Sequence, residues 1–137
     1  MIAYLETSAL LAWLLGQKSA TEVQSSVDAA ESVWTSALTF AEAGRNLARE
    51  ESSKRLRASD HQKLRGVLAK ARRGWMTFQM SEDIVRRASE PFPVEPIRTL
   101  DAIHLATALE LARALPEITV LSLDRRILDN AEALGLR

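Results

Sequence analysis

Apolar and polar residues along this chain follow two different periodicities. Short, nearly continuous apolar runs favour buried strands, whereas apolar positions at helical spacing favour helices. Runs of the first kind cover residues 2–5, 32–35, 75–80 and 118–123. The helical pattern covers residues 7–16, 19–30, 36–51, 58–73, 81–90 and 100–115, and returns after residue 124. Strands alternating with helices predict a three-layer α/β/α fold around a mostly parallel central sheet of about four to five strands.

Residue types that cap helices stand at the predicted helix ends. Hydroxyl or carboxylate side chains precede four of the helical runs, at Ser36, Ser81, Thr99 and Asp124. Gly74 and Gly135 lie where a glycine terminates a helix. Residues 90–98 hold three prolines and are the one segment expected to be irregular. No repeat or linker divides the chain, so residues 1–137 are expected to form a single domain.

Composition narrows the chemistry that is open to the chain. Hydrophobic residues make up 47% and charged residues 26%, values typical of a folded domain and not of a disordered one. Cysteine is absent, which excludes disulfides, thiolate metal sites and cysteine nucleophiles. The two histidines, His61 and His104, are too few to build a zinc centre. Any bound metal is therefore expected to be a hard cation held by oxygen atoms.

The start of the chain carries no targeting signal. It lacks the basic beginning of a signal peptide, and the longest clean apolar run, Ala9–Leu15, is far shorter than the roughly 20 residues of a membrane helix. We therefore expect a cytoplasmic protein that does not contact a membrane.

Charge is balanced overall but distributed unevenly. Eighteen basic residues offset eighteen acidic ones. Residues 1–53 carry a net charge of −4, residues 54–73 carry +7, and residues 74–137 carry −3. A cationic helix on an acidic body suits a polyanionic partner. A helix face that is charged only because it meets solvent is the simpler alternative.

Four acidic residues occupy apolar surroundings, where a carboxylate is costly. Glu6 and Asp124 directly follow the first and last predicted strands, and Glu42 and Asp101 lie in apolar helical runs. Functional groups of parallel sheets gather beyond the carboxyl ends of the strands. Four converging carboxylates would repel one another unless a divalent cation neutralised them. Taken singly, each has a structural alternative: Glu6, Asp101 and Asp124 at helix starts, and Glu42 paired with Arg45 or Asn46.

Four segments of the chain resemble the motifs of PIN-domain proteins, and in particular VapC-type toxins of toxin–antitoxin pairs. These segments are residues 4–11, 35–42, 98–108 and 120–126. The resemblance implies a PIN-like fold and an endoribonuclease that depends on Mg²⁺ or Mn²⁺, whose substrates are structured RNAs such as transfer RNA. It also implies a homodimer, and a cognate antitoxin whose tail enters the active-site groove.

Carried over position by position, the resemblance assigns the acidic metal site to Glu6, Glu42, Asp101 and Asp124. Three hydroxyl residues, Thr7, Ser8 and Ser122, match positions that support this site or contact phosphate. In the proposed chemistry a divalent ion activates water, and Glu42 either binds metal or orients the attacking water.

Glu6 departs from the family pattern, which has aspartate in the first motif. The additional methylene lengthens the side chain by roughly 1.3–1.5 Å, and a misplacement of that order can cost about 100-fold in rate. Glu6 therefore marks an active variant with an adjusted backbone, a weakened nuclease, or a substitution that reduces toxicity. The alternative function is a catalytically weakened or silent PIN domain that binds RNA or an antitoxin.

Candidate RNA contacts follow from helical spacing. Arg45, Asn46 and Arg49 share the helix face of Glu42, and Arg98 lies in the third motif. A basic stripe beside an acidic metal site suits an RNA backbone, although neutralisation within the helix explains it equally well. A receiver-type phosphoacceptor domain is disfavoured because no lysine follows Lys70.

Overall fold

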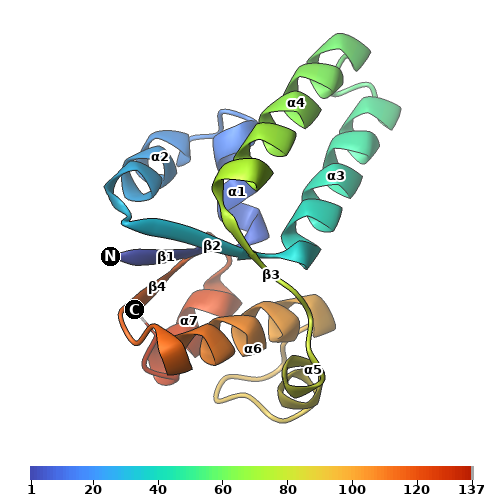
Figure 1. The fold of residues 1–137 in the computed structure, drawn as a ribbon. Helices are drawn as coiled ribbons and strands as arrows, with labels where there is room; N and C mark the ends of the chain where they lie inside the picture. Colours follow the sequence, from blue (N-terminus) through green and yellow to red (C-terminus); the bar gives the residue numbers. More distant parts are fainter. Residues whose placement is uncertain (137) are drawn as a thin grey trace.

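The computed structural model describes residues 1–136 as a parallel sheet between two layers of helices (Figure 1). The strands are β1 (Ile2–Leu5), β2 (Ser32–Ser36), β3 (Met76–Phe78) and β4 (Ile118–Leu121). The helices are α1 (Thr7–Leu14), α2 (Ala20–Ala29), α3 (Ala37–Ser52), α4 (Ala58–Gly74), α5 (Glu82–Ala88), α6 (Thr99–Ala114) and α7 (Arg125–Ala133).

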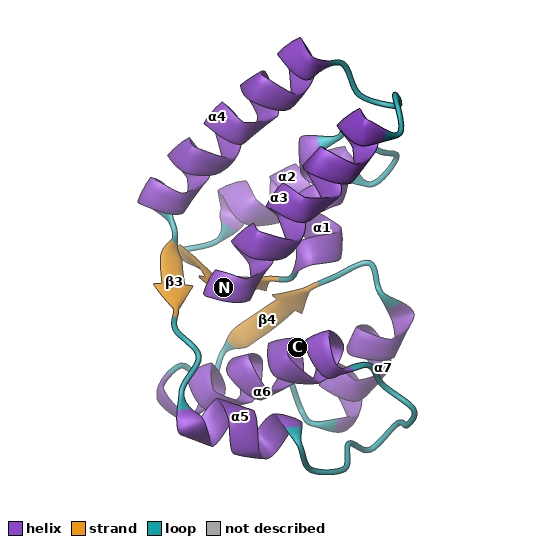
Figure 2. Ribbon diagram, turned by 90° about the vertical axis from the view of Figure 1, so that its right-hand side faces the viewer, coloured by secondary structure: helices purple, strands orange, loops and turns teal. Residues whose placement is uncertain are grey.

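The sheet has the strand order β3-β2-β1-β4, and every pair of neighbouring strands is parallel. Helices α1 to α4 cover one face and α5 to α7 cover the other (Figures 1 and 2). This confirms the predicted α/β/α layering with four strands. None of the helices within residues 1–136 has the length and apolar character needed to cross a bilayer.

Each face of the sheet has its own hydrophobic core, because successive side chains of a strand point to opposite sides. Leu5 of β1 packs with Leu10 and Leu47 on the side of α1 to α4. Tyr4, its neighbour in the strand, packs with Leu105 and Ile118 on the side of α5 to α7. All six side chains are at most 1% exposed, so β1 is the strand buried on both faces.

Most of the predicted helix caps are confirmed. The side chains of Ser36, Ser81 and Asp124 accept hydrogen bonds from the N–H groups of Leu38, Ile84 and Arg126 at 3.1, 3.3 and 2.8 Å. Gly135 has a φ of 74° just after α7, as expected of a glycine terminator.

The predicted cap at Thr99 is wrong. Thr99 is the first residue of α6, and Arg98 holds the cap position without a capping side-chain bond. Two strands are also shorter than predicted. β3 is an edge strand that stops at Phe78, and β4 stops at Leu121 because Ser122 already turns toward the cap of α7.

The topology brings the segments that follow β1 and β4 together at the carboxyl ends of the strands. β1 and β4 are neighbours, and the N–H of Glu6 donates to the carbonyl of Leu121 at 3.0 Å. The residues that follow each strand therefore lie side by side at the carboxyl ends, where parallel sheets place functional groups.

Candidate functional site

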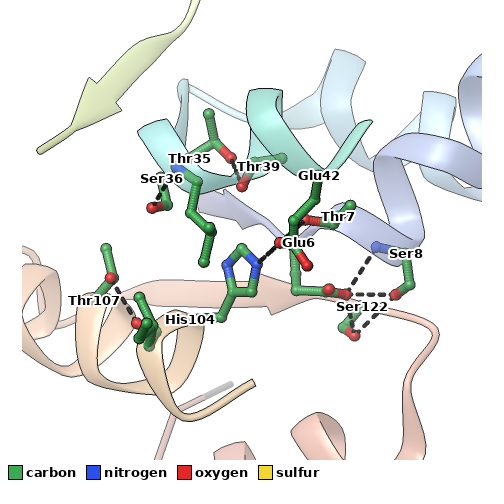
Figure 3. A network of polar contacts seen from close by, with 12 residues as sticks. Glu6, Thr7, Ser8, Thr35, Ser36, Thr39, Glu42, His104, Thr107 and Ser122 are labelled. Carbon is green, nitrogen blue, oxygen red and sulfur yellow. Dashed lines mark hydrogen bonds and ion pairs between the residues drawn. The ribbon is translucent and has the colours of Figure 1, made fainter. Parts of the chain in front are cut away.

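Glu6 ends β1 and occupies the N-cap position of α1. Its side chain is 4% exposed, and one oxygen, Oε2, accepts hydrogen bonds from the Ser8 N–H at 3.0 Å and from the Ser122 hydroxyl at 2.7 Å. The Ser8 hydroxyl donates to the same oxygen (Figure 3). These donors compensate for the loss of water around a buried carboxylate. The other oxygen, Oε1, has no hydrogen-bond partner within residues 1–136.

Two serine hydroxyls tie Glu6 to the segment after β4. The Ser8 hydroxyl accepts from the N–H of Leu123 at 2.8 Å, and the Ser122 hydroxyl accepts from the N–H of Asp124 at 3.0 Å. Each hydroxyl thus donates to Glu6 and accepts from the backbone beyond β4. The arrangement explains why small hydroxyl residues occupy positions 8 and 122: they hold Glu6 and the turn before Asp124 in register.

Asp101 lies in the first turn of α6 and is half-buried. Burial, together with the negative charges of Asp124 and Glu6, raises the pKa of its carboxyl above the ordinary value, and the nearby Arg98 and His104 oppose this rise. The carboxyl of Asp101 is therefore near enough to both Asp124 and Glu6 to be affected by their negative charges.

Glu42 lies beside this group but has different partners. Its Oε1 atom is 2.6 Å from Nε2 of His104 and accepts a hydrogen bond from the Thr7 hydroxyl at 2.7 Å (Figure 3). Partial burial raises the pKa of Glu42, but the hydrogen bonds from His104 and Thr7 outweigh it and leave the pKa below the ordinary value. Glu42 is therefore held as a carboxylate. The alternative that it pairs with Arg45 or Asn46 is wrong.

A buried chain of hydrogen bonds stands behind Glu42. The Tyr4 hydroxyl is 2.8 Å from Nδ1 of His104, and both side chains are at most 1% exposed. Burial and then the charge of Glu6 raise the pKa of Tyr4 well above its ordinary value, so the phenol keeps its proton and donates to Nδ1. The hydrogen-bond network then assigns the remaining ring hydrogen to Nε2, which donates to Glu42.

An open groove of about 430 Å³ adjoins Glu42 and collects most of the predicted RNA contacts. Its walls come from α1, α3 and the start of α6, and its residues are Thr7, Leu11, Ala41, Glu42, Arg45, Asn46, Arg49 and Leu100. The side-chain oxygen of Asn46 is buried there without a partner within residues 1–136. Arg98 is exposed and lies outside this groove, near Asp101.

The donor set suits a hard divalent cation. Beyond the hydrogen bonds described, Glu6, Glu42 and Asp124 each keep one carboxylate oxygen without a partner within residues 1–136, and Asp101 keeps both. Oxygen donors of this kind are the ligands that Mg²⁺ and Mn²⁺ prefer. Within residues 1–136, no three or more His, Asp or Glu side chains already converge tightly enough to hold an ion.

The sequence gives no sign that Tyr4 takes part in this network, although it lies two residues before Glu6 and so projects to the same side of β1. His104 is buried, and its partners are Tyr4, Glu42 and Thr7.

Comparison with known proteins identifies a family for the chain. Residues 3–134 match the PIN domain family. The ribonuclease VapC35 of Mycobacterium tuberculosis is 35% identical over 140 residues, which cover 97% of this chain and 92% of that protein.

Two crystal structures share the fold. VapC20 of Mycobacterium tuberculosis, described as a sarcin–ricin loop cleaving toxin, superposes with a TM-score of 0.70 at 15% identity, covering 98% of this chain and 96% of that one. PAE2754 from Pyrobaculum aerophilum superposes with a TM-score of 0.62 at 20% identity, covering 98% and 93%. Residues 3–134 match the PIN domain family over nearly the whole chain, and the chain is 35% identical to VapC35. This chain therefore belongs to the PIN-domain family.

Proposed function

We propose that this protein is an endoribonuclease toxin of the VapBC type that hydrolyses RNA phosphodiester bonds with the help of Mg²⁺ or Mn²⁺. The proposal is supported by Asp101, whose carboxyl is affected by the negative charges of Asp124 and Glu6, and by Ser122, which bridges Glu6 and the Asp124 backbone. A divalent cation would relieve the repulsion on Asp101. The kinship with VapC35, which is named a ribonuclease, supports the same activity.

The acids have distinct roles in this proposal. Glu6, Asp101 and Asp124 would hold the cation, directly or through water. A divalent cation bound there supplies an acidified water and relieves charge on the phosphoryl oxygens. Glu42 lies at the margin of this site, where its free oxygen would bind the metal or orient the attacking water, while His104 and Thr7 hold its other oxygen.

The groove beside Glu42 provides the substrate contacts. Arg45 and Arg49 bind RNA phosphates, and the unpartnered oxygen of Asn46 accepts a hydrogen bond from the RNA. Arg98, which lies outside this groove and near Asp101, makes a further contact with RNA. We expect the substrate to be a structured RNA, such as transfer RNA or a loop like the sarcin–ricin loop that VapC20 is described as cleaving.

Partners and location complete the proposal. We expect the toxin to be a homodimer in the cytoplasm and to be inhibited by a cognate antitoxin whose tail occupies the groove. Leu11 and Leu100 give that groove an apolar border, which an antitoxin tail can cover together with the arginines.

A catalytically silent PIN domain that binds RNA or an antitoxin is the second candidate. It is favoured by the state of Glu6, whose Oε2 atom already accepts three hydrogen bonds and whose side chain is longer than the family aspartate. In that case the groove still binds its partner, but no bond is broken.

Cleavage of RNA separates the two candidates. Purified protein is incubated with a labelled stem-loop RNA and Mn²⁺, with a chelator and with the Asp101→Asn variant as controls. The nuclease proposal predicts cleavage products that both controls abolish. RNA binding without cleavage at any Mn²⁺ concentration would establish the silent binding module instead.

A further inference from the structure

Helix α4 contributes little to the hydrophobic core. Its only buried residue within Ala58–Gly74 is Leu68, and together with α3 it extends away from the sheet as a helical hairpin (Figures 1 and 2). A helix in a globular protein is held chiefly by the apolar face that it buries. We therefore look to a function of its exposed surface to explain the residue composition of α4.

That surface carries cations without acidic partners. The single acid of α4, Asp60, pairs with Arg57 at 3.1 Å, and Glu50 of α3 pairs with Arg55 at 2.8 Å. Further along α4, five cations form no ion pair with any of residues 1–136: Lys63, Arg65, Lys70, Arg72 and Arg73. The dipole of the helix favours cations in its last turn, which accounts for Arg72 and Arg73 but not for the others.

Two of these cations face α3. Arg65 and Arg72 are seven residues apart and lie on one side of α4, in a groove of about 190 Å³. The guanidinium carbon of Arg72 lies 5.1 Å from the centre of the Phe40 ring, and Arg65 lines the same groove as Gly44. Contact with Phe40 restrains the Arg72 guanidinium, which lowers the entropy that a bound phosphate would cost.

This groove and the groove beside Glu42 lie on opposite flanks of α3. Phe40 and Gly44 face α4, whereas Ala41, Arg45 and Arg49 face α1. A helix is about 10–12 Å across with its side chains. The side chains of α3 between the two grooves are small, so the distance across the helix is shorter here. A single strand of RNA that crosses α3 can therefore meet arginines on both sides.

We infer that Arg65 and Arg72 form a second RNA-binding surface that continues the groove beside Glu42, and that it binds the phosphates of RNA outside the cleavage site. This inference rests on the proposed ribonuclease function. Arginine suits the task because its planar guanidinium binds phosphate through two parallel hydrogen bonds. Such a surface gains affinity from local cation density and not from net charge.

The chain offers a matched control. Lys63 and Lys70 are also unpaired, are also seven residues apart, and lie on the face of α4 turned about half a turn away from Arg65 and Arg72. The Arg65→Gln/Arg72→Gln and Lys63→Gln/Lys70→Gln variants remove the same charge from the same helix. Only the first pair faces α3.

The test measures RNA affinity without cleavage. A fluorescein-labelled stem-loop RNA and a labelled tetranucleotide are titrated in chelator by fluorescence anisotropy at several salt concentrations. For the stem-loop, we expect Arg65→Gln/Arg72→Gln to weaken binding about 10-fold near 0.1 M salt and to reduce the slope of log K against log salt by about 1.5–2. The RNA affinity of Lys63→Gln/Lys70→Gln should be close to that of the unaltered protein. Arg65→Lys/Arg72→Lys should restore the salt slope but only part of the affinity, because lysine keeps the charge and loses the planar guanidinium. The tetranucleotide should bind all variants alike.

Several outcomes would overturn the inference. Equal loss in the two glutamine variants would mean that general charge, and not this surface, attracts RNA. Full affinity in Arg65→Gln/Arg72→Gln, with a changed oligomeric state in size-exclusion chromatography, would assign the surface to a protein partner. If the unaltered protein binds no RNA at all, both this inference and the proposed function fail, whereas binding that ignores Arg65 and Arg72 contradicts only the inference.

Discussion

His104 Nε2 lies 2.6 Å from Glu42 Oε1, and this contact joins the buried side of α6 to the one site acid that comes from α3. The histidine is 1% exposed and the glutamate 22%, so the pair spans the boundary between core and groove. The orientation of Glu42 is thus determined from inside the protein, and Tyr4 supports His104 from behind.

Replacing Tyr4 by Phe should weaken the fold. The change removes the hydroxyl that donates to His104 and leaves a buried ring nitrogen without a partner. We expect the free energy of unfolding, measured by urea titration, to fall by about 1–3 kcal/mol. A Tyr4→Phe protein as stable as the original would show that the hydroxyl does not hold His104.

The Glu42→Gln variant should separate structure from chemistry at this position. The Gln side-chain oxygen can still accept hydrogen bonds from Thr7 and His104. We therefore expect the free energy of unfolding to change by less than about 1 kcal/mol. Loss of the negative charge should lower RNA cleavage by about 100-fold or more. Unchanged cleavage would exclude Glu42 from the reaction, and a Glu42→Ala variant shows what loss of both hydrogen bonds does to stability.

Shortening Glu6 to Asp should raise activity if the site is catalytic. Aspartate is a preferred N-cap residue, so α1 is expected to keep its cap. The carboxylate would move by roughly one methylene, which in an octahedral Mg²⁺ site can change the rate by up to about 100-fold. Single-turnover cleavage of the stem-loop RNA measures the change. Cleavage by neither protein would favour the silent binding module.

Asn130 anchors the proline-rich segment that precedes α6. The side chain is fully buried, accepts from the N–H of Val94 at 2.9 Å, and donates to the carbonyls of Val94 and Arg126 at 2.9 and 3.0 Å. Asn130→Ala should lower the free energy of unfolding by about 2–4 kcal/mol because it leaves these groups unpaired. Hydrogen exchange should show faster exchange at Val94, and unchanged exchange there would contradict the role.

Most of the secondary structure could be predicted from the sequence, because the local patterns of apolar and capping residues agree with the elements that the fold contains. Apolar runs predicted all four strands, and Ser36, Ser81 and Asp124 predicted helix starts. The strand order, and which helices cover which face, were not predictable because they depend on packing between distant segments. The prediction of a cap at Thr99 is wrong because Thr99 is the first residue of α6. The error is a single residue, which periodicity does not resolve.

The membership of the candidate site stays a prediction, and the partners of its side chains could not be predicted from the sequence. The rule that parallel strands end at one edge was enough to place Glu6 beside Asp124. Nothing in the sequence links Glu42 with His104, which is 62 residues away, or His104 with Tyr4, 100 residues away. Such contacts are set by the packing of α6 against β1 and α3, which only a three-dimensional structure shows.

A crystal of the protein soaked in Mn²⁺ shows whether Glu6, Asp101 and Asp124 bind a divalent cation, because anomalous scattering locates the ion independently of catalysis. We expect an anomalous peak among these three carboxylates that is lost in the Asp101→Asn variant. An ordered site with these carboxylates apart and no peak between them would contradict this expectation.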